Sequence, residues 1–345
     1  MEPHSPLRLT LDGEALVSNW RWLAKMSGPA ACGAAVKADG YGLGAPDVAM
    51  RLANAGCRDF FVATWAEAEA LIPWIGDASV SVLHGVQEED MPVATASRAR
   101  PVLNTPLQVA RWKERGGGPC DVMVDTGMNR LGLSPEEAAG LLDGLEVEAL
   151  MSHLASADED VASNECQRAL FATVAAQIPA RRYSLANSAG ICLGLTYAFD
   201  LTRPGLALYG GIPRPEAEGQ IRPVVRVEAQ IVQRRSVKAG DCVGYNATWT
   251  ADASAEIAIL NIGYADGYLR GFSGTGRARI GDGFAPVVGR VSMDLTVVLV
   301  DEAPELREGD WVELDYDLPS ASAQSGLSQY ELLTTLGSRH NRRWA

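Results

Sequence analysis

The chain has 345 residues, a length that suggests about two domains. Its hydrophobic fraction of 47% is enough for a sizeable core, and its formal net charge is −13, from 43 acidic and 30 basic residues. A chain this acidic lacks the basic surface that nucleic acids and anionic membranes require, so both are excluded as expected partners, whereas a small anionic ligand needs only a few local cations.

Cysteine and histidine usage argues against crosslinks and metal sites. The 6 cysteines form no CxxC pair, and no two of the 4 histidines have metal-ligand spacing. We therefore expect reduced thiols and no metal. The N-terminal residues contain no apolar stretch of signal-peptide length, and no window approaches the roughly 18 apolar residues of a membrane span. These patterns predict a soluble, cytoplasmic protein.

Short apolar runs alternate with helix-like segments over the first two thirds of the chain. Residues 14–26 and 163–177 have helical spacing, and Ser134–Glu137 combines a cap, a first-turn proline and acids at a helix start. Short, uniformly apolar runs are typical of strands buried on both faces of a parallel sheet. We expect such strands at 31–36, 59–63, 80–83, 100–103, 120–124, 147–151, 183–186 and 205–208. Eight strand–helix alternations predict a (β/α)8 TIM-type barrel over residues 12–216.

The pattern changes after about residue 217, where apolar runs are separated by glycine and aspartate. The β-like runs are 224–232, 256–262, 286–291, 295–300 and 311–315. Ser320–Ser325 is interpreted as a short polar loop, and a final helix is expected around Tyr330–Leu336. Arg8–Leu11 fits as a strand of the same unit. We therefore predict a second, mostly β domain made of residues 1–11 and 217–345.

Polar residues gather around the ends of several predicted barrel strands. In a barrel of this kind the loops after the strands carry the chemistry. The residues at these positions are Lys37, Asp125-Thr126-Gly127, Ser152-His153, Asn187-Ser188, and, around the eighth strand, Arg203-Pro204-Gly205 and Tyr209. A solvated surface would not need to gather these groups at one end.

Lys37 directly follows a small apolar run, which places its amine in a partly dry site at the barrel mouth. Burial lowers the pKa of a lysine and makes the amine nucleophilic toward a carbonyl. On this local feature alone, a strand-end lysine that reaches solvent is the favoured reading. The loop that follows has three glycines around Tyr41, so its backbone can approach a ligand closely, and this shifts the balance toward a binding site.

Nine segments, taken in order, resemble the motifs of the alanine racemase family. They are AVKADGYGLG (35–44), VDTGMNRLG (124–132), SHLASAD (152–158), NSAG (187–190), RPGLALYG (203–210), VGYNATW (243–249), IGYADGYLR (262–270), GRVSMD (289–294) and YELL (330–333). Any one segment is a weak signal, but nine in order over nearly the whole chain are highly specific. The resemblance implies a fold-type III enzyme that uses pyridoxal phosphate (PLP) to interconvert L-alanine and D-alanine for peptidoglycan.

The resemblance also implies site residues. Lys37 would carry PLP and act as one of two acid/base groups, and Tyr245 of the partner subunit would be the other, activated through His153 and Arg203. Without this context Tyr245 would be read as a surface aromatic. The implied cofactor-binding residues are Lys37, Tyr41, His153, Asn187, Ser188, Arg203, Gly205, Leu206 and Tyr330. The implied substrate-binding residues are Arg130, Met293 and Tyr264, with Asp158, Arg270 and Arg290 along the access corridor.

Two of these implied residues carry a physical argument. A guanidinium keeps its protons, so Arg203 opposite the pyridine nitrogen would leave that nitrogen unprotonated and make PLP a weaker electron sink. Side reactions such as transamination would then be suppressed. Ser188 is expected to open a short helix over 188–195, and helix N-termini bind anions such as the PLP phosphate.

The chain departs from the family pattern at Met123. Many members have a carbamylated lysine there, whose negative charge orients the substrate-binding arginine. Methionine cannot replace that charge, so Arg130 must be held by Asp125, by an anion or by a neighbouring side chain. The departure bears on catalytic efficiency and substrate preference more than on the fold or on PLP binding.

Other functions remain as alternatives. A serine racemase or a broad-specificity amino-acid racemase would keep the mechanism. A PLP decarboxylase would normally pair the pyridine nitrogen with a carboxylate, and Arg203 argues against that. A non-enzymatic PLP protein on a lone barrel would not need the β domain that carries Tyr245. The expected partners are a small amino-acid substrate and a second copy of the chain, in a homodimer with shared active sites.

Overall fold

The structure is a computed structural model that describes residues 4–345, and the chain divides into two compact units. One unit comprises the chain up to Gly13 together with Pro223–Ala345, and the other comprises Glu14–Arg222. The boundaries therefore lie after residues 13 and 222, whereas the sequence pattern placed them after residues 11 and 216. The first unit is discontinuous in sequence because its first strand precedes the whole of the second unit.

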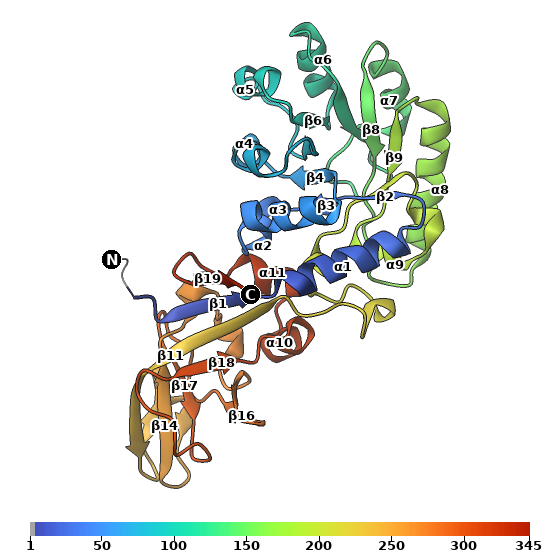
Figure 1. Cartoon of the computed structure of the whole chain (residues 1–345). Coiled ribbons are helices and arrows are strands. Elements are labelled where there is room, and N and C mark those ends of the chain that lie inside the picture. The colour runs from blue at the N-terminus through green and yellow to red at the C-terminus, as the bar shows by residue number, and fades with distance from the viewer. Residues whose placement is uncertain (1–3) are drawn as a thin grey trace. The chain divides into compact units, whose positions relative to one another are not determined.

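The unit Glu14–Arg222 is built on parallel strands in a curved row (Figure 1), which backbone hydrogen bonds close into a ring, as the sequence predicts. Its strands are β2 (Ala31–Cys32), β3 (Ala34–Ala35), β4 (Asp59–Val62), β5 (Ser79–Val82), β6 (Arg100–Leu103), β7 (Cys120–Met123), β8 (Val147–Met151), β9 (Arg182–Ser184) and β10 (Leu201–Thr202). The first strand is interrupted at Gly33, where an added Cβ would lie 2.7 Å from the Asp59 carbonyl oxygen. Strands β3 to β9 pair in sequence order, and β10 pairs with β2. Backbone bonds from Asp200 N to Tyr183 O (3.0 Å) and from Arg203 N to Ala186 O (2.8 Å) join β9 to β10 and close the ring.

The eighth strand is not where the sequence predicts it. Residues 206–209 form a short 3-10 helix, η3 (Leu206–Tyr209), and the eighth strand is β10. The prediction of 205–208 was wrong because a four-residue apolar run buried on all sides has the same pattern in a strand and in a buried helical turn. As a consequence Arg203 follows its strand, at the same end of the barrel as Lys37.

Helices follow the strands and lie along the outside of the curved row that the strands form (Figure 1). They are α1 (Gly13–Met26), α2 (Lys37–Tyr41), α3 (Ala45–Ala55), α4 (Trp65–Leu71), α5 (Met91–Ala96), α6 (Pro106–Glu114), α7 (Pro135–Leu141), α8 (Ala162–Gln177) and α9 (Ser188–Cys192), with the 3-10 turns η1 (Ile72–Trp74), η2 (Leu195–Tyr197) and η4 (Pro215–Ala217). The predicted helices 14–26 and 163–177 are confirmed by α1 and α8. The predicted cap Ser134 accepts a hydrogen bond from Glu137 N (3.3 Å) at the start of α7.

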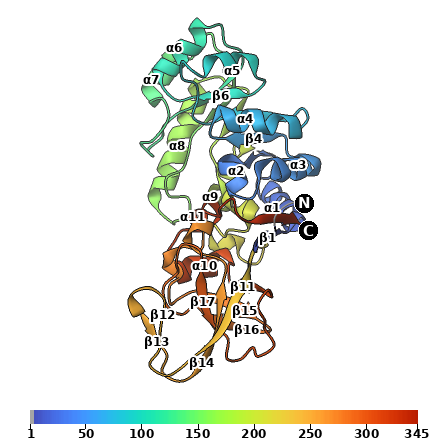
Figure 2. The same ribbon diagram turned by 90° about the vertical axis from the view of Figure 1, so that its left-hand side faces the viewer.

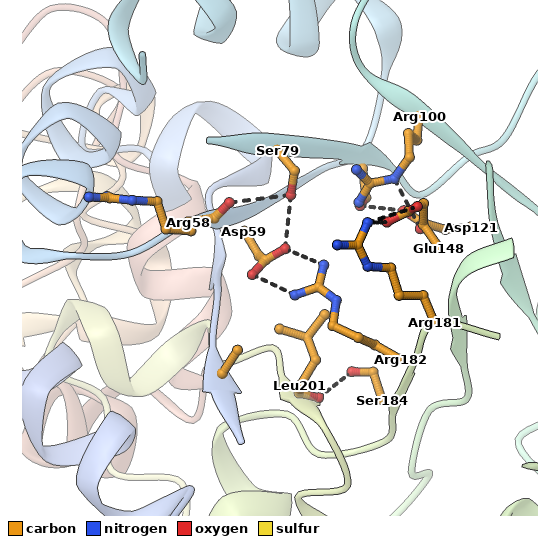
Figure 3. Close-up of polar contacts among 12 residues, drawn as sticks. Arg58, Asp59, Ser79, Arg100, Asp121, Glu148, Arg181, Arg182, Ser184 and Leu201 are labelled. Carbon is orange, nitrogen blue, oxygen red and sulfur yellow. Dashed lines mark hydrogen bonds and ion pairs between the residues drawn. The ribbon is translucent and has the colours of Figure 1, made fainter. Parts of the chain in front are cut away.

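Charged pairs fill the end of the barrel at which the strands begin (Figure 3). The Arg182 guanidinium donates two hydrogen bonds to Asp59, at 2.6 and 2.9 Å. Asp121 is fully buried and accepts from Arg100 Nε (3.2 Å) and from Ser81 Oγ (2.5 Å). Burial opposes ionisation of Asp59, but Arg182 holds the pKa of its carboxyl below the usual range. Removing one partner of such a pair leaves an uncompensated charge and costs about 3–5 kcal/mol.

The other unit is a mostly antiparallel sheet (Figure 2). Its strands are β1 (Leu7–Leu11), β11 (Val225–Val237), β14 (Ala255–Leu260), β15 (Arg277–Ile280), β16 (Gly283–Pro286), β17 (Thr296–Leu299), β18 (Trp311–Leu314) and β19 (Asn341–Trp344). β12 (Cys242–Val243) pairs separately with β13 (Trp249–Thr250), and the helical segments are α10 (Leu318–Ser325), α11 (Gln329–Thr334), η5 (Tyr245–Ala247), η6 (Tyr264–Asp266) and η7 (Arg270–Phe272). β1 buries alternate residues and pairs with β11, which confirms the predicted strand at 8–11.

Two predictions for this unit were wrong. Residues 318–325 form helix α10 rather than a polar loop, because Leu318 and Ala321 provide a buried face that the serines conceal. The run 286–291 is not one strand, since β16 ends at Pro286 and Gly289 turns the chain with φ 69°. An added Cβ at Gly289 would lie 2.7 Å from the Val243 carbonyl oxygen, so this turn packs closely against the segment that precedes Tyr245.

Candidate active site

Lys37 lies at the end of β3, and the chain after it adopts an unusual conformation. Residues 38–41 are all left-handed, with φ between 52° and 61°. This conformation costs an L-residue roughly 1–2 kcal/mol, and only Gly40 of the four avoids that cost. The turn is held from within, because Asp39 Oδ1 accepts a hydrogen bond from Ala45 N (2.8 Å) and Gly40 N donates to Val36 O (2.8 Å). The chain thus maintains a strained turn directly after the lysine.

The surroundings of Lys37 favour its neutral amine. Burial lowers the pKa of Lys37, and the charges of Arg130 and Arg203 lower it further, whereas Glu67 opposes them. A lysine whose pKa is lowered has more of its free amine at neutral pH, and the free amine is the nucleophile. Lys37 is therefore chemically suited to bind a carbonyl group covalently.

Arg203 follows β10 and is buried, with 6% of its surface exposed. Its Nη2 donates to the Ser152 carbonyl (2.6 Å), its Nη1 donates to Ser184 Oγ, and its guanidinium carbon lies 6.0 Å from the centroid of the Phe61 ring. Burial lowers the pKa of Arg203 to about 10, against the opposing charge of Asp121. The side chain therefore stays charged at neutral pH while both of these hydrogen-bond partners are uncharged.

His153 follows β8 and lies among the same cations. Burial, followed by the charges of Arg203, Arg130 and Lys37, lowers the pKa of His153 to about 3. The imidazole is therefore neutral at any pH at which the enzyme would work, with one nitrogen free to accept a hydrogen bond.

The pKa of His153 leads to a prediction for stability. We expect the ring proton resonances of His153 to show no titration between pH 5 and 8 in an NMR experiment. The unfolded state, with an ordinary histidine pKa near 6.5, binds more protons than the folded state between about pH 6.5 and 3. His153 therefore contributes to the loss of stability as pH falls through that window, and His153→Gln should flatten this part of the pH profile in thermal unfolding. A His153 resonance that titrates near pH 6.5 would contradict the assignment.

Tyr41, Ser188 and Gly205 form a cradle in which two hydroxyl groups and backbone N–H groups lie next to one another. The Tyr41 ring stacks on Tyr209 with centroids 4.7 Å apart. Ser188 Oγ accepts hydrogen bonds from Gly205 N (2.9 Å) and from Ala207 N (3.2 Å), at the start of η3 where Leu206 lies. An added Cβ at Gly205 would lie 2.3 Å from the Tyr41 hydroxyl oxygen. Backbone N–H groups and hydroxyls that converge in this way suit a phosphate.

The close approach of Tyr41 to Gly205 can be tested by substitution. Gly205→Ala should displace the Tyr41 hydroxyl and weaken PLP binding roughly tenfold, because overpacking a filled site costs about 1–3 kcal/mol. The measurement is a fluorescence titration of the PLP-free protein with PLP. Gly118→Ala is the matched control, since a Cβ at Gly118 meets open space. An unchanged PLP affinity in Gly205→Ala would show that this cradle does not hold the cofactor.

Asn187 stabilises the first turn of a helix. It is the N-cap of α9, where its Oδ1 accepts from Gly190 N (2.8 Å), and Ser188 is the first residue of the helix, as the sequence predicts. The helix ends at Cys192, three residues before the predicted end at 195. Ser188 is then free of the capping position, and its hydroxyl is directed to the backbone of η3 instead.

Arg130 is exposed in the loop after β7, and Asp125, one of the three supports considered for it, does not pair with it. Asp125 Oδ1 accepts hydrogen bonds from Gly127 N (2.8 Å) and Met128 N (2.9 Å), so it shapes its own turn. Met123 is buried at the end of β7 and carries no charge. Within residues 4–345, Arg130 makes no ion pair, so its positive charge acts on Lys37 and His153 without a neutralising carboxylate.

The strand-rich unit gathers the other implied residues around three loops. Tyr245 begins η5 and is 67% exposed. The preceding Gly244 lies against the backbone of Arg290, because a Cβ there would be 3.3 Å from Arg290 N. Tyr264 N donates to Ser292 O (3.0 Å), beside the exposed Met293, and the Arg270 guanidinium carbon lies 5.1 Å from the centroid of the Tyr264 ring. These loops therefore form one connected surface within the unit.

Tyr330 and Asp158 lie on different units. Tyr330 is in the first turn of α11, which begins with a capping box between Ser328 and Glu331. Asp158 is exposed in the loop after β8. The buried Arg214 fixes this loop in place by donating a hydrogen bond to the Ala157 carbonyl (3.1 Å). Each unit thus positions its own share of the implied residues.

Sequence reasoning missed several residues that shape the site. Glu67 bonds the backbone next to Lys37, and Ser184 bonds Arg203 together with the backbone carbonyl of Ser152, a residue that the strand-end pattern had already named. In the strand-rich unit, Arg339 donates to Asp266 (2.6 Å) below the Tyr264 turn. The pattern Thr64-x-x-Glu67 at the end of a predicted strand was a usable signal, because it predicts a capping box.

The residues that the structure describes form neither a metal-binding cluster nor a membrane-spanning helix. Over residues 4–345, no group of three or more histidines, cysteines, aspartates or glutamates is arranged to hold a metal ion. In the same range no helix has the length and apolar character needed to cross a membrane.

Comparisons with known proteins agree with this geometry. Residues 11–213 match the family described as "Alanine racemase, N-terminal domain", and residues 224–344 match "Alanine racemase, C-terminal domain". An alanine racemase from Methylobacterium nodulans is 46% identical over 353 residues, covering 98% of this chain and 95% of that protein. Two proteins from Agrobacterium fabrum, named "Alanine racemase, biosynthetic" and "Alanine racemase, catabolic", are 40% and 41% identical, and cover 99% and 97% of this chain and 94% and 91% of their own lengths. The crystal structure of alanine racemase from Bartonella henselae with covalently bound pyridoxal phosphate superimposes with a TM-score of 0.93 at 35% identity, covering 99% of this chain and 100% of that one.

Proposed function

Because this chain belongs to the alanine racemase family, we propose that it interconverts L-alanine and D-alanine with PLP held at Lys37. The observation that carries the proposal is the convergence of Lys37, Arg203 and His153 at one end of the barrel, beside the cradle at Gly205. Lys37 offers an amine of lowered pKa to a carbonyl, and the cradle offers donors to a phosphate. The residues present therefore fit PLP.

When bound, PLP supplies the electron-withdrawing group that acidifies the proton on the substrate Cα. Racemisation then needs one base on each face of that carbon. We assign one face to Lys37 Nζ and the other to the phenol oxygen of Tyr245 of the partner subunit. One group removes the proton and the other returns it from the opposite side, so the same pair serves both directions.

The remaining residues bind and orient. Tyr41, Ser188, Tyr330 and the backbone at Gly205 and Leu206 would hold the phosphate. Arg203 would face the pyridine nitrogen as a donor that keeps its protons, which supports racemisation over transamination. Arg130 and the Met293 backbone would hold the substrate carboxylate. Asp158, Tyr264, Arg270 and Arg290 would line the access corridor.

The proposal is tested by a racemisation assay on purified protein with added PLP, in which each L-amino acid is followed by chiral chromatography. Strong and selective conversion of L-alanine is the expected result. Preferential conversion of serine or larger amino acids would replace alanine as the substrate; Arg130 makes no ion pair within residues 4–345, so the site that would hold the substrate carboxylate differs from the family pattern. Binding of PLP without racemisation of any amino acid would refute the racemase assignment.

We also propose a homodimer in which each active site is completed across the interface. Tyr245 is 67% exposed and belongs to a different unit from Lys37. A residue that completes the active site of a partner subunit is expected to be exposed in the single chain. Activity per chain should fall when the enzyme is diluted below the dimer dissociation constant, measured together with sedimentation of the same samples. Full activity in a sample shown to be monomeric would refute the shared site.

We also propose that this protein is a cytoplasmic enzyme that supplies D-alanine for peptidoglycan. A relative named biosynthetic and one named catabolic resemble the chain to a similar degree. Deletion of the gene should make growth depend on added D-alanine. Normal growth without D-alanine, combined with failure to use D-alanine as a carbon source, would assign the enzyme to D-alanine breakdown instead.

A further inference from the structure

Glu67 lies outside every motif that the sequence singled out, yet its carboxylate contacts the backbone next to Lys37. Its Oε1 accepts a hydrogen bond from Ala38 N at 2.7 Å. Its Oε2 accepts from Ala63 N (2.6 Å) and Thr64 N (3.2 Å), in the loop between β4 and α4. A single carboxylate therefore links the lysine-bearing turn to the next strand–helix loop of the barrel.

The position of this bridge matters because the turn is strained. Ala38 is the first of the residues with positive φ, at 54°, and it directly follows Lys37. The hydrogen bonds of Asp39 and Gly40 hold the turn to itself and to β3 and α3, whereas Glu67 ties it to the β4–α4 loop. Strained backbone persists only where its surroundings over-determine it. Glu67 is therefore the side chain that ties the residue after Lys37 to the β4–α4 loop.

Glu67 also differs in charge from the other groups that act on the Lys37 amine. The charged groups that act on the Lys37 amine are Arg130, Arg203 and Glu67, and Lys37 in turn acts on the neutral His153. Glu67 is the negatively charged member of this set, and it acts against the two arginines on the lysine amine. Its removal would leave the amine among positive charges alone.

We propose that Glu67 is a positioning residue for Lys37, whose carboxylate fixes the lysine-bearing turn through Ala38 and balances the positive charge around the amine. The inference rests on the proposed function in so far as Lys37 is the residue that binds PLP. It adds a residue from a separate helix, α4, to the machinery.

The experiment follows covalent attachment of PLP to the purified, full-length protein after it has been freed of cofactor. The rate at which the visible absorption band develops is measured across pH, and borohydride reduction followed by peptide mass analysis checks that Lys37 is modified. Glu67→Gln removes the charge and replaces one acceptor by a donor. We expect the pH midpoint of the rate to fall by about one unit and the plateau rate to fall about tenfold.

Three further variants separate charge, position and helix capping. Glu67→Asp keeps the charge but shortens the reach, so the plateau rate should fall while the midpoint stays at the wild-type value. Thr64→Ala removes the hydroxyl that caps α4 at Glu67 N (3.3 Å) without touching Ala38. Glu69→Gln, on the same helix, removes a carboxylate that is bonded to Ser97 (2.7 Å) instead. Both controls should behave as wild type.

Specific outcomes overturn the proposal. It fails if Glu67→Gln keeps the wild-type midpoint and plateau, or if Thr64→Ala reproduces the changes seen in Glu67→Gln, since the effect would then be one of helix capping. Should Glu67→Gln not fold, a wild-type plateau rate in Glu67→Asp would be sufficient to reject the positional part. Wild-type protein that attaches PLP at Lys37 but racemises nothing would refute the proposed function while the same titration still decides the role of Glu67.

Discussion

Lys37→Ala should abolish both racemisation and the visible absorption band of lysine-linked PLP. The substitution removes the amine that follows β3 and that is subject to the charges of Arg130, Arg203 and Glu67, and with it one of the two proposed acid/base groups. A lost acid/base group costs typically 10²–10⁴-fold, and loss of the covalent attachment adds to that, so we expect kcat/KM to fall by at least about 10⁴-fold. Absorption spectra and chiral chromatography measure the two effects on the same sample.

The control for this experiment is Lys25→Ala, in the last turn of α1, where the side chain is exposed. It should keep both the band and the activity. A visible band that persists in Lys37→Ala would identify a different attachment site. Retention of the band together with activity would remove Lys37 from the mechanism altogether.

Tyr245→Phe should impair the two directions of the reaction unequally. If Tyr245 of the partner subunit serves one face of the substrate Cα and Lys37 the other, loss of the phenol removes proton exchange from L-alanine more than from D-alanine. We expect exchange from the L-enantiomer to fall by about 10²–10⁴-fold. The measurement is deuterium uptake at Cα from heavy water, started separately from each enantiomer and followed by mass spectrometry.

Tyr197→Phe is the matched control, because the Tyr197 hydroxyl contacts Glu165 (3.4 Å) on α8, away from the residues assigned to the site. It should leave both exchange rates unchanged. Equal losses from the two enantiomers in Tyr245→Phe would contradict the two-base assignment and would indicate that Tyr245 acts on binding rather than on one proton.

The parts of the fold that follow from local pattern could be predicted. The barrel strands before the eighth could be located because each is a short apolar run next to turn residues, and the start of α7 could be located from its Ser134 cap. The eighth strand could not, because β10 has only the two residues Leu201–Thr202, whereas the more conspicuous apolar run at 206–209 is a buried 3-10 turn. Run length and apolar character do not distinguish these two conformations.

The site residues likewise divide into those that could be predicted from the sequence and those that could not. Lys37 and the loops after β7 and β8 could be anticipated, since strand ends in a barrel carry the chemistry. Glu67 could not, because its role depends on a hydrogen bond to Ala38 across 29 positions of the chain. Support of Arg130 by Asp125, one of the three supports considered, failed because a short carboxylate next to a glycine bonds its own turn more readily than a distant side chain. Such pairings depend on tertiary packing, which sequence spacing does not encode.

The partly buried ion pair of Asp59 and Arg182 has a consequence for how this protein can change over generations. Its two residues are 123 positions apart in the chain, on β4 and β9. Losing Arg182 alone would leave the buried Asp59 carboxylate without its ion-pair partner, at a cost of up to about 3–5 kcal/mol, a large share of the roughly 5–15 kcal/mol by which a typical protein is stable. During evolution this ion pair is therefore expected to be replaced only when both residues are substituted at nearly the same time, or after stabilising substitutions elsewhere. We expect descendants of one ancestral barrel to inherit the two residues as a unit, or to have replaced both with an apolar pair of similar volume.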